Sequence, residues 1–304
     1  MPQQGAEQVR VEAPTEARNP RTTDIDQLST VDVLRKINDE DALVPRAVAA
    51  VLEELAILVD AAVEAIRAGG RVHYVGAGTS GRLAVLDAAE LVPTYNVPED
   101  LFVSHHAGGA EALRTAAENV EDDTENGAAE IRESATGKDV VVGLAASGRT
   151  PYVLGALRAG RELGARTALI SANPQAEGNA LVDVALAVDT GPEVIAGSTR
   201  MKAGTAQKLI LNAFSTAVMI KLGHTYSNFM VSMRATNAKL RGRTLRILQE
   251  ATDADEQRCA EALAEADGDM KTALVTLLAE VSSAHASDAL RASDGNVRKA
   301  LAAL

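Results

Sequence analysis

Residues 71–95 read Arg-Val-His-Tyr-Val-Gly-Ala-Gly-Thr-Ser-Gly-Arg-Leu-Ala-Val-Leu-Asp-Ala-Ala-Glu-Leu-Val-Pro-Thr-Tyr. The apolar run at 72–75 is typical of a short buried strand. A tight loop with three glycines follows: Gly76, Gly78 and Gly81. This loop carries the hydroxyls of Thr79 and Ser80, and the apolar residues after it have helical spacing. A loop between a strand end and a helix N-terminus offers free N–H groups and the positive end of the helix dipole, so it favours an anion such as phosphate.

The same pattern recurs twice, each time at the start of a predicted helix. The second loop contains Ser147, Gly148 and Thr150, and the third contains Ser198, Thr199, Arg200 and Lys202. A single Ser or Thr in such a place is most often a helix cap. Three loops that each combine a hydroxyl, a glycine and an arginine instead favour one shared anion pocket at the carboxyl edge of a sheet.

Apolar runs that alternate with helical segments indicate the fold class. Strands are expected over residues 72–75, 101–104, 140–145, 167–171 and 182–188. Helices are expected over 30–37, 42–67, 111–121 and 152–163, and a long apolar helix over 206–222. This order predicts an α/β fold, with a doubly wound, mostly parallel sheet flanked by helices.

Composition changes along the chain suggest three parts. Residues 1–25 are polar and contain three prolines, so we expect a flexible N-terminal arm. Residues 26–240 hold the α/β pattern, and residues 241–304 read as a small all-helical C-terminal domain. Within that domain, residues 267–274 resemble residues 294–301, although two copies are too few to define a repeat array.

Charge and cysteine content exclude several classes of protein. The net charge of −12 argues against a nucleic-acid or anionic-membrane partner, because both require a basic face. The longest uncharged apolar stretch, residues 209–220, is far shorter than the roughly 20 residues of a spanning helix, so we expect no membrane association. Cys259 is the only cysteine, which fits a reducing, cytoplasmic location.

The sequence favours neither a cofactor nor a metal. Residues 76–81 match the dinucleotide fingerprint G-x-G-x-x-G, but the second strand ends in His105 and His106 instead of the acidic residue that binds ribose. No Gly-Lys-Ser/Thr follows, which disfavours a nucleoside triphosphate. The adjacent His105 and His106 should point to opposite faces of the sheet, so they cannot chelate a metal together.

Two glutamates are candidates for acid–base chemistry. Glu90 follows Ala88 and Ala89 and precedes Leu91, and apolar surroundings disfavour a charged carboxylate, so Glu90 could serve as a general acid. Glu121 lies within an acidic cluster, for which solvent exposure is the simpler interpretation.

Several of these segments together resemble the N-acetylmuramic acid 6-phosphate etherases, bacterial members of the sugar isomerase (SIS) fold family that are related to the glucokinase regulatory protein. The resemblance covers residues 28–245 and is carried by the strings at 76–90, 145–153, 191–208, 228–231 and 236–240. The chain departs from the family pattern around Glu90, at Ala89 and Leu91, and at Ser232.

The resemblance implies cleavage of the D-lactyl ether of N-acetylmuramic acid 6-phosphate by a homodimer without a cofactor. Glu90 would protonate the leaving lactyl oxygen and later activate water, and Glu121 would remove the C2 proton. The expected phosphate or sugar ligands are Thr79, Ser80, Gly81, Ser147, Gly148, Thr150, Ser198, Thr199, Arg200 and Lys202. The helix at 206–222 would contribute to the dimer interface.

Two other functions fit the same pocket. A non-catalytic sugar-phosphate sensor would bind the ligand but would not need the paired glutamates. An aldose–ketose isomerase would also exchange the C2 proton, but it would yield a ketose and leave the ether intact.

Overall fold

A computed structural model describes residues 13–115, 119–233 and 238–304. Its five-stranded sheet comprises β1 (Val72–Gly76), β2 (Phe102–His106), β3 (Val140–Leu144), β4 (Arg166–Ser171) and β5 (Val184–Ala187). The strand order is β2-β1-β3-β4-β5 and every neighbouring pair is parallel, which confirms the predicted doubly wound fold.

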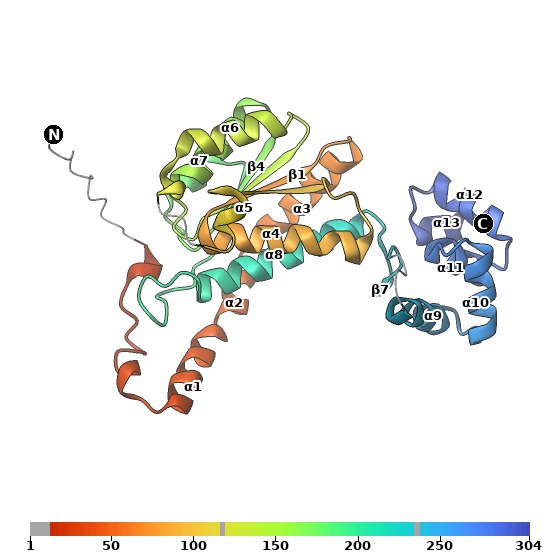
Figure 1. The fold of residues 1–304 in the computed structure, drawn as a ribbon, viewed down its shortest axis with the longest axis horizontal. Coiled ribbons are helices and arrows are strands. Elements are labelled where there is room, and N and C mark those ends of the chain that lie inside the picture. Colours follow the sequence, from red (N-terminus) through yellow and green to blue (C-terminus); the bar gives the residue numbers. More distant parts are fainter. Residues whose placement is uncertain (1–12, 116–118, 234–237) are drawn as a thin grey trace. The chain divides into compact units, whose positions relative to one another are not determined.

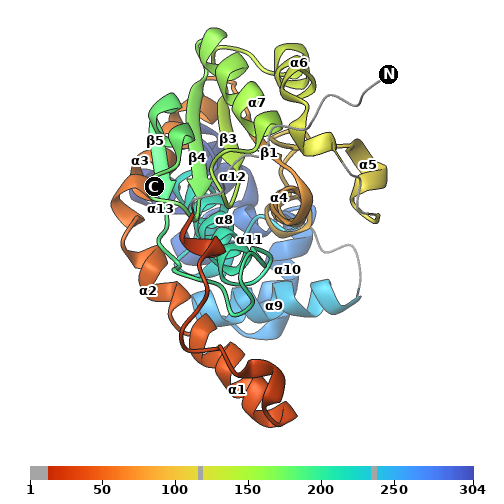
Figure 2. The same ribbon diagram turned by 90° about the vertical axis from the view of Figure 1, so that its left-hand side faces the viewer.

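Helices cover both faces of this sheet. Figure 1 shows α6 (Thr124–Ser134) and α7 (Pro151–Glu162) on one face, with α3 (Leu52–Arg67) and the first parts of α4 (Gly78–Tyr95) and α8 (Lys202–Lys221) on the other. In the view turned by 90°, α3 and α6 again lie on opposite sides of the strands (Figure 2). The remaining elements of this region are the helices α1 (Thr30–Asp41), α2 (Val44–Ala49) and α5 (Gly109–Ala112), and the 3-10 turns η1 (Pro14–Glu16), η2 (Ile25–Gln27), η3 (Val120–Asp122) and η4 (Glu177–Leu181).

Strand β1 illustrates why both faces must be covered, because all five of its residues are buried. Its Tyr74 lies on one face and packs against the rings of Phe102 and Phe214. Its Val75 lies on the other face, in a core cluster with Tyr152 and other residues of α7. Side chains alternate along a strand, so a strand in a two-sided core must be apolar almost throughout.

The chain divides into two compact units. The sheet unit comprises the residues up to Leu86 and Phe102–Phe214, and the helical unit comprises Asp87–Leu101 and Ser215–Leu304. Helices α4 and α8 therefore contribute residues to both units. This division differs from the predicted boundary at 240, because residues 215–233 and the end of α4 belong with the helical unit.

The helical unit has its own apolar core. It contains the short strands β6 (Thr225–Tyr226) and β7 (Phe229–Met230) and the helices α9 (Ala238–Thr252), α10 (Glu256–Glu265), α11 (Met270–Ala279), α12 (Ser283–Ala292) and α13 (Val297–Ala303). Their buried side chains form one cluster around Leu248, Leu274 and Val275. The two similar sequences are two equivalent helix caps: Asp269 accepts from the N–H of Thr272 at α11, and Asn296 accepts from the N–H of Lys299 at α13.

Three expectations about local structure differ from the structure. The helix expected over 42–67 is two helices, α2 and α3, with Pro45 in the first turn of α2, where its missing N–H is harmless. The helix expected over 111–121 is reduced to α5 and η3, with residues 116–118 outside the described part.

The predicted flexible arm is the third difference. Its residues 1–12 lie outside the described part, but residues 13–25 are packed, with Thr15, Asn19 and Thr22 buried. Among the described residues, none of the helices combines the length and the apolar character that crossing a bilayer requires.

Candidate functional site

Two of the three hydroxyl loops begin side by side at the carboxyl edge of the sheet. Strands β1 and β3 are neighbours, and Gly76 at the end of β1 pairs with Leu144 at the end of β3. The first loop leads into α4 and the second into α7, which cover opposite faces of the sheet (Figure 1). The space between two such strands is the topological switch point, where open α/β sheets bind their ligands.

The first loop is tightly built around its glycines. A Cβ on Gly76 would lie 2.7 Å from the backbone nitrogen of Gly81, and a Cβ on Gly81 would lie 2.5 Å from the His106 ring. The buried Ser80 hydroxyl donates to Gln207 Oε1 at 2.9 Å, whereas Thr79 is half-buried. Ser80 therefore joins the loop to α8, and Thr79 is the side-chain hydroxyl of this loop that is open to a ligand.

The second loop keeps a hydroxyl in reserve. Gly148 has a φ of +68°, and a Cβ there would lie 2.3 Å from that of Ala176. Among the described residues at the start of α7, Thr150 occupies the N-cap position but its side chain makes no capping hydrogen bond. Ser147 and Thr150 are both half-buried, and Ser147 Oγ accepts from the N–H of Arg149 at 3.3 Å. The Thr150 hydroxyl is therefore placed at a helix start without serving as its cap.

The third loop has a built-in anion. The buried carboxylate of Glu193 accepts from the backbone N–H of Lys202 at 2.9 Å and from that of Ala203 at 3.0 Å. These N–H groups belong to the first turn of α8, where a phosphate would otherwise bind. Burial raises the pKa of Glu193, and the two backbone hydrogen bonds oppose this rise. The start of α8 is thus already neutralised from within the chain.

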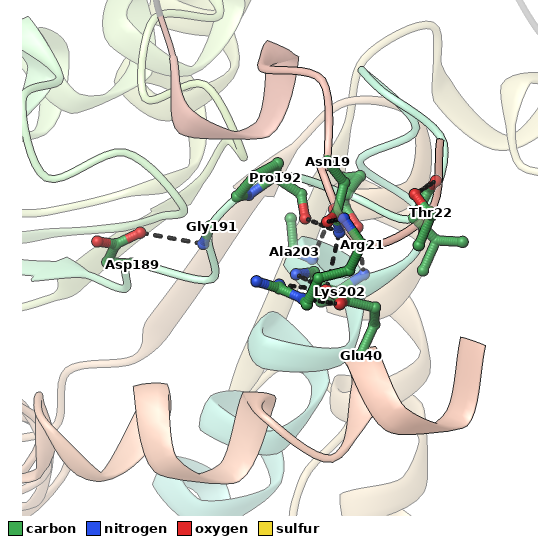
Figure 3. A network of polar contacts seen from close by, with 11 residues as sticks. Asn19, Arg21, Thr22, Glu40, Asp189, Gly191, Pro192, Lys202 and Ala203 are labelled. Carbon is green, nitrogen blue, oxygen red and sulfur yellow. Dashed lines mark hydrogen bonds and ion pairs between the residues drawn. The ribbon is translucent and has the colours of Figure 1, made fainter. Parts of the chain in front are cut away.

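Lys202, predicted to neutralise the substrate, has a different partner. Its side chain is fully buried, and its Nζ lies 2.8 Å from Glu40 Oε2. The same carboxylate receives hydrogen bonds from Arg21 and from Asn19 Nδ2, the latter at 2.9 Å (Figure 3). The hydrogen bond from Arg21, with those from Lys202 and Asn19, lowers the pKa of Glu40 to about 2 despite its burial.

This network is therefore structural. It ties the N-terminal segment to the third loop, and the hydroxyl of Thr22 adds a hydrogen bond to the Val194 carbonyl at 2.8 Å. The assignment of Lys202 to the substrate is wrong for this structure, because the ammonium is enclosed by Glu40. The loop's other predicted ligands are more open: Ser198 and Thr199 are half-buried and Arg200 is exposed.

The two predicted acid–base glutamates are both exposed. Glu90 lies on the part of α4 that belongs to the helical unit, and Glu121 lies on η3 of the sheet unit. The apolar surroundings predicted for Glu90 are wrong for the single chain, because Ala89 beside it is also exposed. The solvent exposure expected for the acidic cluster around Glu121 is confirmed.

Two surface clefts in the described part of the chain lie elsewhere. One, of about 520 Å³, is at the amino edge of the sheet and is lined by Lys138, Asp139 and Arg166, among others. The other, of about 750 Å³, lies in the helical unit beside Lys271 and Arg291. Neither includes a residue predicted to bind the substrate.

Sequence reasoning overlooked the residues that hold the loops in place. Gln207 and Glu193 stand within the strings that carry the family resemblance, but no role was assigned to them. Glu40 gave no signal, because it lies 162 positions from Lys202 in the sequence.

Fold and loops together define a class of protein. The chain matches the N-terminal SIS domain of the glucokinase regulatory protein over residues 54–161. Among solved structures, a phosphoheptose isomerase from Francisella tularensis superposes with a TM-score of 0.52 at 17% identity, covering 63% of this chain and 98% of that one. The sheet unit is therefore a sugar isomerase-type α/β domain.

Closer relatives identify the family. An N-acetylmuramic acid 6-phosphate etherase from Thermobifida fusca is 63% identical over 88% of both chains. The etherase from Pectobacterium atrosepticum is 50% identical over 94% of this chain and 95% of its own length. This chain belongs to the N-acetylmuramic acid 6-phosphate etherase family.

Proposed function

We propose that this protein is a lyase that cleaves the D-lactyl ether at C3 of N-acetylmuramic acid 6-phosphate. The products are N-acetylglucosamine 6-phosphate and D-lactate, and the reaction serves the catabolism of cell-wall amino sugars. Family membership supports this proposal. The structural observation that carries it is the pairing of Gly76 with Leu144, which starts two hydroxyl loops side by side at the switch point of the sheet.

The phosphate is assigned to the first two loops. Their open donors are the hydroxyls of Thr79, Ser147 and Thr150 and the backbone N–H groups of Gly81 and Gly148. Ser80 supports the first loop through Gln207. In the third loop, Ser198, Thr199 and Arg200 face the rest of the sugar, and Lys202 is excluded because Glu40 already neutralises it.

Two carboxyl groups suffice for the chemistry. In the open-chain sugar, the C2 proton is acidic because it is adjacent to the C1 aldehyde, and Glu121 removes it as a general base. The lactyl alkoxide is a poor leaving group, so Glu90 protonates it as the C3–O bond breaks. Glu90 then takes a proton from water, which adds to C3 of the unsaturated aldehyde.

The exposure of both glutamates supports a homodimeric enzyme, in which a second copy covers the site. Helix α1 also leaves large apolar side chains uncovered, with Val31 51% and Leu34 59% exposed, and α8 exposes Ile220. Light scattering would give the mass of the assembly in solution. The single free Cys259 supports a cytoplasmic location.

The decisive experiment incubates the purified protein with N-acetylmuramic acid 6-phosphate and measures D-lactate and the sugar product. Stoichiometric lactate is expected. A ketose with the ether intact would indicate an isomerase, and binding without turnover would indicate a sensor. Either result would overturn the lyase assignment.

The roles of the two glutamates can be separated in deuterated water. Glu90→Gln should stop lactate release but still exchange the C2 proton, because proton removal precedes departure of lactate. Glu121→Gln should lose both reactions, and Glu99→Gln, at another exposed glutamate, should keep both. Loss of exchange in a folded Glu90→Gln variant would contradict the assigned roles.

A further inference from the structure

Two histidine rings are stacked inside the sheet unit, where the proposed reaction does not use them. His73 on β1 and His105 on β2 have ring centroids 5.3 Å apart and planes inclined by only 17°. His73 Nδ1 lies 3.0 Å from His105 Nε2, which is hydrogen-bond distance. His73 is fully buried and His105 is 9% exposed.

A carboxylate stands at each end of this pair. Asp139 Oδ2, just before β3, lies 3.4 Å from His73 Nε2. Glu130 Oε2, on α6, lies 3.4 Å from His105 Nδ1 and also accepts from the hydroxyl of Tyr152 on α7 at 2.7 Å. The four groups thus form one array in the order Asp139, His73, His105, Glu130.

Counting protons shows that two neutral rings cannot satisfy this array. Its three contacts each need one proton on a ring nitrogen: one facing Asp139, one between the rings and one facing Glu130. Two neutral imidazoles carry only two N–H groups. One lone pair would then face a carboxylate, which is repulsive in a buried site. The array is satisfied when it holds one extra proton.

The surroundings indicate which groups are charged. Asp139 accepts from the backbone N–H groups of Thr136 and Arg71, and its pKa is lowered although burial opposes this. The pKa of Glu130 is also lowered against burial, through His105, Tyr152 and Asn126. Burial, with the nearby positive charge of Arg71 and His105, lowers the pKa of His73 to about 4. Two carboxylates and a neutral His73 leave His105 as the place for the extra proton.

We propose that His105 is an imidazolium held between His73 and Glu130, and that this buried ion pair makes Glu130 a positioning residue for the segment that carries Glu121. The first half of the proposal is a statement about the fold. The second half rests on the function proposed above.

The packing of α6 explains how Glu130 could act on Glu121. Helix α6 follows η3 directly, with Asp123 as its N-cap, so a shift of the helix moves Glu121 with it. Its contact with α7 is close: a Cβ on Gly127 would lie 2.0 Å from the Tyr152 carbonyl oxygen. Glu130 bonds both to Tyr152 of α7 and to His105 of β2, and so fixes α6 against the helix that begins at Thr150.

Deprotonation at alkaline pH should weaken this attachment, because the lone pair of His105 Nδ1 would then face the Glu130 carboxylate. A Glu130→Gln variant should behave differently. Its amide can donate to a neutral His105, so the array would need no extra proton.

The protonation state can be measured directly with ¹⁵N-labelled histidine, of which the chain has five. Near neutral pH, both ring nitrogens of His105 should have the shifts of protonated nitrogen, with assignment by a His105→Gln variant. In Glu130→Gln, one of these nitrogens should change to the shift of an unprotonated nitrogen. A neutral His105 in the unmodified protein, or a spectrum unchanged by Glu130→Gln, would overturn the proposal.

The positioning role is tested by kinetics. Glu130→Gln should lower kcat by about ten- to hundred-fold, as expected for a misplaced catalytic group, and leave KM within about twofold. The alkaline fall in kcat seen in the unmodified enzyme should disappear. Glu133→Gln, at an exposed glutamate of the same helix, is the control and should change neither. Unchanged kcat in a folded Glu130→Gln variant would refute the positioning role.

Failure of the proposed function would be distinguishable from failure of this inference. If the unmodified protein released no lactate, the lyase assignment would fall, and the ring protonation would still be read from the spectra. If lactate were released and His105 were neutral, only the present inference would fall.

Discussion

The ammonium of Lys202 lies 2.8 Å from the carboxylate of Glu40, and both side chains are almost completely enclosed by protein. A buried ion pair contributes little when intact, but removing one partner leaves an uncompensated charge. We therefore expect Lys202→Met to lower the free energy of unfolding by about 3–5 kcal/mol. The exposed Lys208, also on α8, is the control: Lys208→Met should change it by less than about 0.5 kcal/mol. Urea unfolding measures both.

Glu40 adds a pH dependence with a definite sign. Its pKa is about 2 when folded, against 4.5 as the ordinary value, so the unfolded chain binds the proton first. Its contribution to stability is full above about pH 4.5 and is lost as the pH falls toward about 2. Glu40→Gln should reduce this part of the acid sensitivity, and an unchanged acid profile would contradict the assignment.

Thr150 and Ser80 should differ in what their hydroxyls contribute. A hydrogen bond to a charged phosphate is worth about 1.5–3 kcal/mol, so Thr150→Val should lower kcat/KM roughly ten- to hundred-fold with little change in stability. Thr150→Ser should retain activity. Ser80→Ala leaves buried Gln207 without its partner and should instead lower stability by about 1 kcal/mol. A stability loss in Thr150→Val with unchanged kinetics would show that Thr150 only supports the fold.

Gly155 marks the closest approach of α6 and α7. A Cβ there would lie 2.0 Å from the carbonyl oxygen of Thr124, which is backbone and cannot rotate away. Gly155→Ala should lower the free energy of unfolding by about 3 kcal/mol through overpacking. On α9, a Cβ on Gly242 meets no atom of the described residues within 4 Å. Gly242→Ala should therefore raise stability by about 0.5–1 kcal/mol, and thermal unfolding would compare the two.

His224 should make the helical unit less stable in mild acid. Burial, with the nearby Lys271, lowers the pKa of His224 from 6.5 to about 4. The unfolded chain therefore binds this proton more readily, and stability falls between about pH 6.5 and about pH 4. His224→Asn should flatten this interval, whereas the exposed His285→Asn should not. Urea midpoints measured across the interval would test it, and equal slopes in both variants would argue against the assignment.

The strands could be predicted because each is a short apolar run closed by glycine or polar residues. The opposite orientations of His105 and His106 also followed from strand geometry, and they are confirmed: His105 faces Glu130 of α6, and His106 contacts the Gly78 carbonyl. That His73 faces His105 could not be predicted, because it depends on β1 pairing with β2 and on their register.

The candidate site was predictable in part. Local spacing places Thr150 at a helix start, but only coordinates reveal that its side chain leaves the cap unfilled. The same spacing made the third loop look equivalent to the first two. What distinguishes it is Glu193, whose carboxylate reaches α8 through a turn with no sequence signature, and Glu40, which arrives from the far N-terminal segment.

The carboxylate of Glu193 at the start of α8 gives the protein an acid-labile plug. Because burial raises its pKa, this group takes up a proton sooner on acidification than a glutamate in water does. The neutral acid no longer balances the positive end of the helix, and dissolved sulfate or phosphate can compete for the freed amides. A seat for inorganic oxyanions is thus sealed at neutral pH and opened by protons.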